Sequence, residues 1–327
     1  MITSPNVFRI AFLLILVCLP VVGCSARSSS SRLTLSQHGS SKADKDSQDT
    51  SDSALRLARL LRDQGRYEAA MGVYAQLSKR AKMTPLELLE YANVAALVCS
   101  PRDTLPLFIR AEKKLTEETD TDLSPEVQAE LYTGLGRARM SVGQYGLAQQ
   151  SLEKALEAAP EKVAALNAMG VLLDAQGNHE EARKMLTRAN ELAPSDERIL
   201  NNLALSYLSS NDSKQAIRLF QQANSISDSP SVKLNLAFTF YMVDQNARAS
   251  SSLQEFMPMA QSEEFITLFD GMKQRVEIGD STVSEELLRA ADKLIEIHPP
   301  TDTDNKGTAP GTLNSDLGKT NQATAAS

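Results

Sequence analysis

The chain has 327 residues, of which 42% are hydrophobic, 5% are aromatic and none is Trp. Its formal net charge is −7, and this acidic balance disfavours a nucleic-acid partner, because binding to phosphates depends on Lys and Arg. The length suffices for an extended helical domain with tails at both ends.

The N-terminus has the pattern of a secretory signal. Arg9 supplies positive charge, and the apolar run over 10–19 (IAFLLILVCL) is too short to span a bilayer as a helix of the mature protein. The sequence VVGC, ending at Cys24, then resembles a bacterial lipobox. The resemblance implies that residues 1–23 are a lipoprotein signal peptide and that the Cys24 thiol carries a diacylglycerol. The alternative is an ordinary secretory signal that happens to end near a cysteine.

The lipobox resemblance also carries an expectation about location. Acyl chains such as palmitate anchor a protein stably when more than one is attached. Ser25 follows Cys24, in place of the Asp that commonly retains lipoproteins of enteric bacteria at the inner membrane. We therefore expect a lipid anchor in the outer membrane, on its periplasmic side. Residues 24–52 are rich in Ser and poor in apolar residues, so we expect them to be a flexible tether.

Residues 53–263 repeat one pattern of small, turn-forming and bulky residues. In the last four units the spacing is 34 or 33 residues. Two weaker units precede them, with Ala58 and Ala92 at the small position, and a polar, acidic stretch over 116–125 interrupts the period. Repetition at this length predicts a helical solenoid, in which each unit buries its apolar face against its neighbours. The three series are Gly136, Gly170, Ala204 and Ala237; Gly143, Gly177, Asn211 and Asp244; and Leu152, Leu186, Phe220 and Leu253.

These series resemble the tetratricopeptide repeat (TPR), a helix-turn-helix unit of 34 residues. The resemblance implies an all-α superhelical solenoid of about six repeats, in which the small residues lie where the two helices of a unit cross. Arg139 departs from the pattern, since a large apolar or aromatic residue is usual there, and Asp228 and Gln261 stand where Pro would close a unit. The expected units are 53–84, 85–118, 129–162, 163–196, 197–229 and 230–263.

Beyond the repeats, residues 264–298 predict a C-terminal pair of capping helices. The pattern favours one helix from Glu264 to Ile278 and another from Ser284 to Ile297, with Ser284 as its N-cap, and we expect the second to shield the last repeat. Two prolines end it. Residues 299–327 are rich in Thr, Asn, Gly and Ala, and we expect a disordered tail.

The sequence holds no pattern that predicts catalysis. His38, His179 and His298 have no Cys or carboxylate near them at the spacing of a zinc site. Gly-rich phosphate loops, nucleophile elbows and Cys/His arrangements are missing as well. We therefore expect a non-enzymatic protein without cofactor, metal or small-molecule substrate. His179 is expected to pack between paired helices, and Cys99, the free thiol, to act as a small buried hydrophobe.

The first helix of each repeat lines the concave side of such a solenoid, and its exposed phase predicts a partner-binding groove. Asparagines can bond an extended partner's backbone, and apolar residues offer a strip for side chains or a helix. The TPR resemblance gives this role to Asn202 and Asn235. Two alternatives stay open: these asparagines pack against the adjacent repeat, and the apolar members touch the capping helices. The predicted groove residues are Asn167, Val171, Asn201, Asn202, Leu205, Asn235, Phe238 and Tyr241.

The runs over 165–174 (ALNAMGVLLD) and 199–207 (ILNNLALSY) resemble the TadD-type lipoproteins of the tight-adherence (Flp) pilus machinery. The resemblance implies an assembly factor that helps a secretin or another pilus-export component to localise or assemble. An adaptor lipoprotein for peptidoglycan hydrolases or for outer-membrane protein assembly has the same layout and is the main alternative. An accessory to an extracytoplasmic enzyme, with its chemistry in the C-terminal helices, is a rival of another class. It is disfavoured because the sequence over 264–298 shows no constellation of polar residues of the kind that catalysis requires.

Overall fold

The computed structural model describes residues 40–80, 83–118 and 124–297. The chain divides into two compact units, Met1–Asp46 and Ser47–Ser327. Within the first unit the described residues, 40–46, are helical. Cys24, the signal peptide and the C-terminal tail lie outside the described residues. The lipid anchor, the cleavage of the signal peptide and the disorder of the tail therefore stay predictions.

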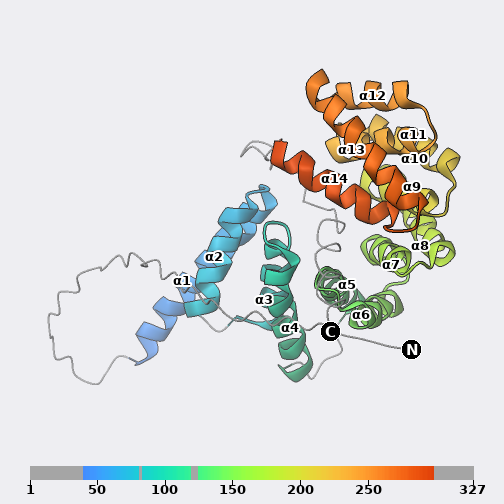
Figure 1. Cartoon of the computed structure of the whole chain (residues 1–327). Helices are drawn as coiled ribbons and strands as arrows, with labels where there is room; N and C mark the ends of the chain where they lie inside the picture. The colour runs from blue at the N-terminus through green and yellow to red at the C-terminus, as the bar shows by residue number, and fades with distance from the viewer. Residues whose placement is uncertain (1–39, 81–82, 119–123, 298–327) are drawn as a thin grey trace, which may run out of the picture. The chain divides into compact units, whose positions relative to one another are not determined.

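The described residues form α-helices and no strand (Figure 1), as the repeat pattern predicts. The helices, in chain order, are α1 (Ser40–Asp63), α2 (Tyr67–Arg80), α3 (Pro85–Ala95), α4 (Pro101–Glu118), α5 (Pro125–Ser141), α6 (Tyr145–Ala158), α7 (Val163–Ala175), α8 (His179–Leu192), α9 (Glu197–Ser209), α10 (Ser213–Ile226), α11 (Pro230–Met242), α12 (Asn246–Gln254), α13 (Met259–Glu277) and α14 (Val283–Ile297).

Consecutive helices pack as pairs, and the pairs stack in chain order. From α3 onward the extensive contacts lie within α3–α4, α5–α6, α7–α8, α9–α10 and α11–α12. Each second helix also packs on the first helix of the next pair, as α6 does on α7 and α8 on α9. First helices contact one another directly at α5–α7 and α7–α9. This is the stacked helix-turn-helix architecture expected of a TPR solenoid.

Close helix crossings explain the series of small residues. A Cβ added at Gly136 would lie 2.6 Å from Cγ of Leu152, and one at Gly170 would lie 2.5 Å from Cγ of Leu186. Both leucines belong to the second helix of the same pair and are fully buried. The small residue and the bulky residue of each unit are therefore two sides of one contact.

The turn between the helices of a pair requires a left-handed backbone at one position. Gly143 and Gly177 have φ angles of 76° and 80° there, and Asn211 and Asp244 have 62° and 60°. Glycine adopts such angles without strain, and Asn and Asp tolerate them better than other residues. This conformational demand accounts for the turn-forming series in the sequence.

Helix α1 begins earlier than the sequence pattern indicates. Residues 40–52 were expected in the flexible tether, but they are helical and continuous with the residues that follow. The expected start of order at 53 is therefore wrong. An existing helix extends at little cost because its nucleation has already occurred, so a polar segment can continue an amphipathic one.

The N-cap of the last helix also differs from the prediction. Thr282, not Ser284, caps α14: the backbone N–H of Glu285 donates to Thr282 Oγ1 at 3.2 Å, and the backbone N–H of Thr282 donates to Glu285 Oε2 at 2.8 Å. This reciprocal pair is a capping box, which the spacing Thr282–Glu285 satisfies.

Of the helices in the described part of the chain, none combines the length and the apolar character that crossing a bilayer demands.

Candidate protein-binding face of the first helices

The first helices of the pairs present one succession of side chains, which we name the first-helix face; these helices are α1, α3, α5, α7, α9 and α11. Side-chain hydrogen bonds link successive members of this face. Arg59 on α1 donates to Glu90 on α3 through Nε and Nη2, both at 2.8 Å. Asn93 on α3 donates from Nδ2 to Glu130 Oε1 on α5 at 2.5 Å.

The predicted groove asparagines continue these links. Asn202 Nδ2 donates to Asn167 Oδ1 at 3.0 Å, which joins α9 to α7. Asn235 Nδ2 donates to Asn201 Oδ1 at 2.8 Å, which joins α11 to α9. Asn201 and Asn235 are buried, whereas Asn167 and Asn202 are half-buried. The asparagines thus hold adjacent repeats together, and their contact with a partner remains a prediction.

Helices α13 and α14 cover the C-terminal part of the first-helix face. α14 contacts α9, α11 and α13. Phe269 on α13 packs against Phe238 and Tyr241 on α11, with ring centroids 5.2 Å and 5.7 Å apart. Tyr241 also donates its hydroxyl hydrogen to Asp270, and burial, followed by this bond, raises its pKa to about 12.

The expectation of an exposed phase is therefore wrong for Leu205, Asn235, Phe238 and Tyr241, which are all buried, Phe238 completely so. It is also wrong for Val171 and Asn201, which are buried too. Leu205, Phe238 and Tyr241 belong to the same apolar cluster as Val283, Leu287 and Leu294 of α14. An apolar strip and an amphipathic helix on one chain bury each other because both are thereby removed from water.

A buried carboxylate fixes α14 to α13. The side chain of Glu286 is fully buried and accepts hydrogen bonds from Arg275 Nε at 2.8 Å and Arg275 Nη2 at 2.6 Å. Ser281 and Arg289 also donate to it. Burial by itself raises the pKa of Glu286, but the bonds from Arg275 and Ser281 and the two positive charges outweigh this effect and lower it.

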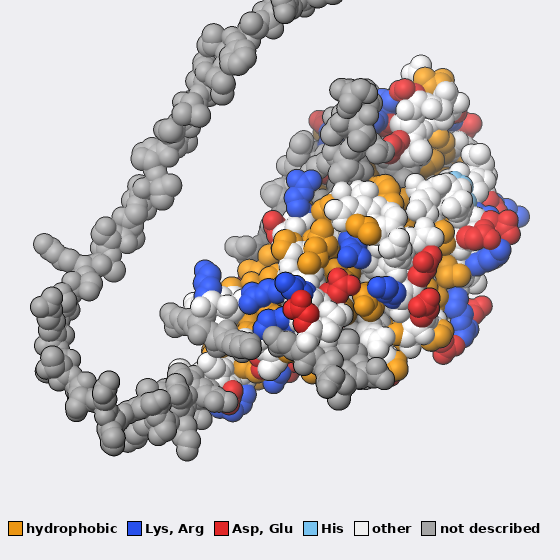
Figure 2. Space-filling model, turned by 90° about the horizontal axis from the view of Figure 1, so that it is seen from below, with side chains coloured by type: hydrophobic (Ala, Val, Ile, Leu, Met, Phe, Trp, Pro, Cys, Tyr) orange, Lys and Arg blue, Asp and Glu red, His pale blue; other side chains and the backbone are white. Residues whose placement is uncertain are grey.

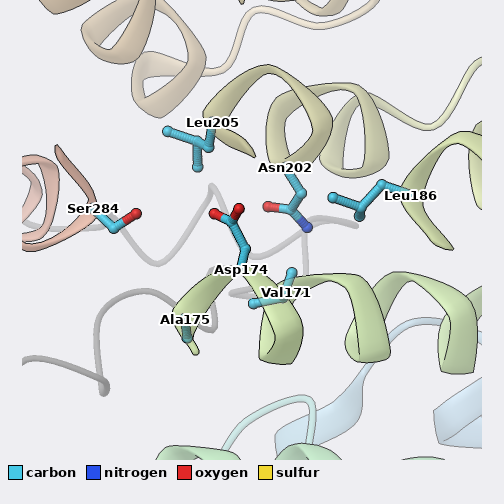
Figure 3. Close-up of a pocket in the computed structure, with 7 residues that line it drawn as sticks. All are labelled: Val171, Asp174, Ala175, Leu186, Asn202, Leu205 and Ser284. Atoms are coloured by element: carbon cyan, nitrogen blue, oxygen red, sulfur yellow. The ribbon is translucent and has the colours of Figure 1, made fainter. Parts of the chain in front are cut away.

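A small cavity lies where the start of α14 meets α7 and α9 (Figure 3). Figure 3 shows Val171 and Asp174 of α7 pointing toward Asn202 of α9, with Ser284 of α14 at the opposite side. The cavity measures about 40 Å³, far below the several hundred Å³ of a typical small-molecule site. Val171, predicted to line a groove, lies in this cavity wall and is 8% exposed.

Two residues discussed from the sequence have partners that the sequence did not indicate. His179 Nδ1 lies 2.6 Å from Asp174 Oδ1, across the turn between α7 and α8. Cys99 is half-buried, and its thiol donates to Met71 Sδ at 3.2 Å. Across the described ranges, we find no group of three His, Cys, Asp or Glu residues that could hold a metal ion.

Arg137 on α5 is a first-helix residue that the sequence reasoning missed. It stands 34 residues before Val171 and 68 before Leu205, at the phase where the later repeats carry apolar residues. Its guanidinium is half-buried and forms no hydrogen bond or ion pair with any described residue. Burial, and then the charge of Arg198, lowers its pKa. A basic residue at a phase that is apolar in the three repeats that follow was the available signal.

Comparison with known proteins supports the repeat architecture. Family models described as tetratricopeptide repeat match residues 139–205, 53–89 and 197–230. The chain therefore contains tetratricopeptide repeats, and its helices form a scaffold of the kind suited to protein–protein interaction. A comparison with curated proteins gives no match.

Several solved structures resemble the chain at low identity. One is MamA, from residue 41 to its end, of Desulfovibrio magneticus RS-1, with 18% identity, a TM-score of 0.43 and coverage of 56% of this chain and 97% of that one. Another is YrrB, described as a TPR protein with an unusual peptide-binding site, with 17% identity, a TM-score of 0.42 and coverage of 60% and 95%. MamA AMB-1 shares 22% identity, with a TM-score of 0.41 and coverage of 54% and 95%.

Proposed function

We propose that this chain is a non-enzymatic, lipid-anchored scaffold of the outer membrane that faces the periplasm and assists assembly of a Tad/Flp pilus machinery. Its TPR units would bind a secretin or another assembly component, while acylated Cys24 would hold the scaffold at the membrane. The lipobox and the TadD-like runs over 165–174 and 199–207 support this assignment.

The binding function is supported by the division of the first-helix face into a part that α13 and α14 cover and a part that they leave uncovered. α13 and α14 cover its C-terminal part, where α14 contacts α9 and α11. Among the described helices, α3 and α5 pack mainly against α2, α4, α6 and α7, which are their neighbours in the stack. Figure 2 shows that charged and hydrophobic side chains share the molecular surface seen from below.

Site-specific photo-crosslinking in cells tests this proposal. The photoreactive residue replaces Leu86 on α3 or Ala164 on α7, two exposed residues of the first-helix face. We expect mass spectrometry to identify a secretin or another pilus-assembly component from both positions. Leu147 on α6, which is 46% exposed, serves as the control on a second helix.

The captured proteins discriminate between the proposals. A peptidoglycan hydrolase or an outer-membrane insertion protein would reject the pilus assignment in favour of the adaptor, which shares the same chain layout. Partners captured from Leu147 but not from Leu86 or Ala164 would contradict binding on the first-helix face.

A further inference from the structure

We propose that Arg137 binds a carboxylate side chain of the protein partner, so that an acidic segment of that partner docks on the first-helix face between α5 and α7. The inference rests on the proposed protein-binding function and specifies the chemistry of the partner at that face.

The links along the first-helix face have a gap between α5 and α7. Every other step between successive first helices, from α1 to α11, is bridged by a side-chain hydrogen bond, and so is the step from α11 to the covering helix α13. For the residues that the structure describes, the α5–α7 step has no such bridge. The bridges are Arg59–Glu90, Asn93–Glu130, Asn202–Asn167, Asn235–Asn201 and Tyr241–Asp270.

The repeat register explains why Arg137 has no acceptor. Arg59, Asn93 and Arg137 each follow the small residue of their first helix, so they share one phase. The first two donate to Glu90 and Glu130 on the next first helix. In α7 the positions equivalent to these two glutamates are occupied by Ala168 and Ala164, whose side chains accept no hydrogen bond.

The charges around Arg137 also favour an anionic partner. Arg137 is half-buried, and the charged group that acts on it is Arg198, another cation. Arg198 already has a carboxylate of its own, because it donates to Asp196 from Nε at 3.1 Å and from Nη2 at 2.8 Å. A guanidinium remains charged under these conditions and presents paired N–H donors that match a carboxylate. The net charge of the chain is −7, so this local positive charge contrasts with the whole.

An acidic protein segment fits this position better than the other occupants considered. A purely apolar helix would need the apolar part of the face, which α13 and α14 already cover. Nucleic acid is disfavoured by the negative net charge. The chain's own acidic residues beyond the described part are the remaining candidates, and the experiment separates them from a partner. They are Asp120, Asp122, Asp302, Asp304 and Asp316.

The test is selection from a random 12-residue phage-displayed peptide library against the purified full-length chain in detergent. We expect selected peptides to share an Asp or Glu at one position. In the Arg137→Gln variant this acidic preference should disappear, and a synthesised winning peptide should bind about tenfold more weakly, as expected for one lost charged hydrogen bond. Arg137→Glu should select Lys or Arg at that position. Arg188→Gln, which removes an exposed arginine of α8, is the matched control.

Each outcome decides one point. An acidic preference that survives Arg137→Gln, or peptides without any acidic position, would overturn the Arg137 proposal while leaving peptide binding intact. A wild-type chain that selects no peptide at all would contradict the binding function itself. If acidic peptides bind only after Asp120, Asp122, Asp302, Asp304 and Asp316 are changed to Asn in the full chain, an acidic segment of the chain itself occupies the site and the external partner is rejected. Thermal unfolding of each variant verifies that it is folded.

Discussion

Single small residues determine how closely the two helices of each pair approach. Gly170 is the clearest case, because an added Cβ would lie 2.5 Å from Leu186 Cγ and 3.1 Å from the backbone oxygen of Ala182. The side chain of Leu186 has some freedom to move, but the backbone of Ala182 in α8 moves only if the helix moves. The size of the side chain at position 170 is therefore limited by the spacing of the two helices and not only by the rotamer of Leu186.

Gly170→Ala should destabilise the protein by about 1–3 kcal/mol through overpacking, although alanine favours helix more than glycine does. Urea unfolding followed by circular dichroism measures the difference. Gly146→Ala on α6 is the control, because a Cβ there meets nothing within 4 Å. The control should be neutral or gain up to about 1 kcal/mol from helix propensity. Equal stability of the two variants would mean that the α7–α8 crossing is looser than the structure shows.

At the scale of elements, α14 determines which part of the first-helix face is available. Its apolar residues Val283, Leu287 and Leu294 are buried, and the carboxylate of Glu286 connects it to Arg275 of α13. The two kinds of contact act together, because the ion pair fixes the position in which the apolar face of α14 reaches α9 and α11.

Glu286→Gln should loosen α14 without unfolding the repeats. Loss of the negative charge leaves Arg275 and Arg289 without their shared anion, and we expect a cost of about 1–3 kcal/mol. Hydrogen–deuterium exchange measured by mass spectrometry should show faster exchange over 283–297 and unchanged exchange over 163–192. Asp292→Asn, on the exposed side of α14, is the matched control. Unaltered exchange in α14 would show that apolar contacts alone hold it.

The carboxylate of Glu286 also predicts that the stability of α14 packing depends on pH. The pKa of Glu286 is lowered below its ordinary value of 4.5, so the folded state binds this proton more weakly than the unfolded state does. Its stabilisation is therefore complete above about pH 4.5 and is lost as the pH falls from there through the lowered pKa. Exchange in α14 of the wild type should accelerate on acidification over that range, and Glu286→Gln should flatten the change. An identical acid response in both proteins would assign the effect to other groups.

At the scale of the whole molecule, the proposed function depends on attachment to a membrane. Cys24→Ala should release the protein into the soluble fraction of the cell envelope and abolish incorporation of labelled palmitate, because the thiol is the site of acylation. Cys99→Ala is the control and should leave both properties unchanged. Palmitate labelling that persists in Cys24→Ala would reject the lipid anchor.

The sequence by itself determined the repeat architecture, because helix crossing and turn formation are local requirements that recur in every unit. Gly136 and Gly170 mark the crossings, and Gly143, Gly177, Asn211 and Asp244 mark the turns, where backbone angles confirm the interpretation. The periodicity also placed the asparagines of 167–235 on the first helices.

Only the tertiary structure decided which of those first-helix residues are accessible. The periodicity predicts an exposed phase for Phe238 and Tyr241, but α13 and α14 pack over them, and no local pattern encodes where a later helix packs. Arg137 shows the reverse case. Its lack of a partner depends on what α7 presents opposite it, because the positions of α7 that are equivalent to Glu90 and Glu130 are alanines.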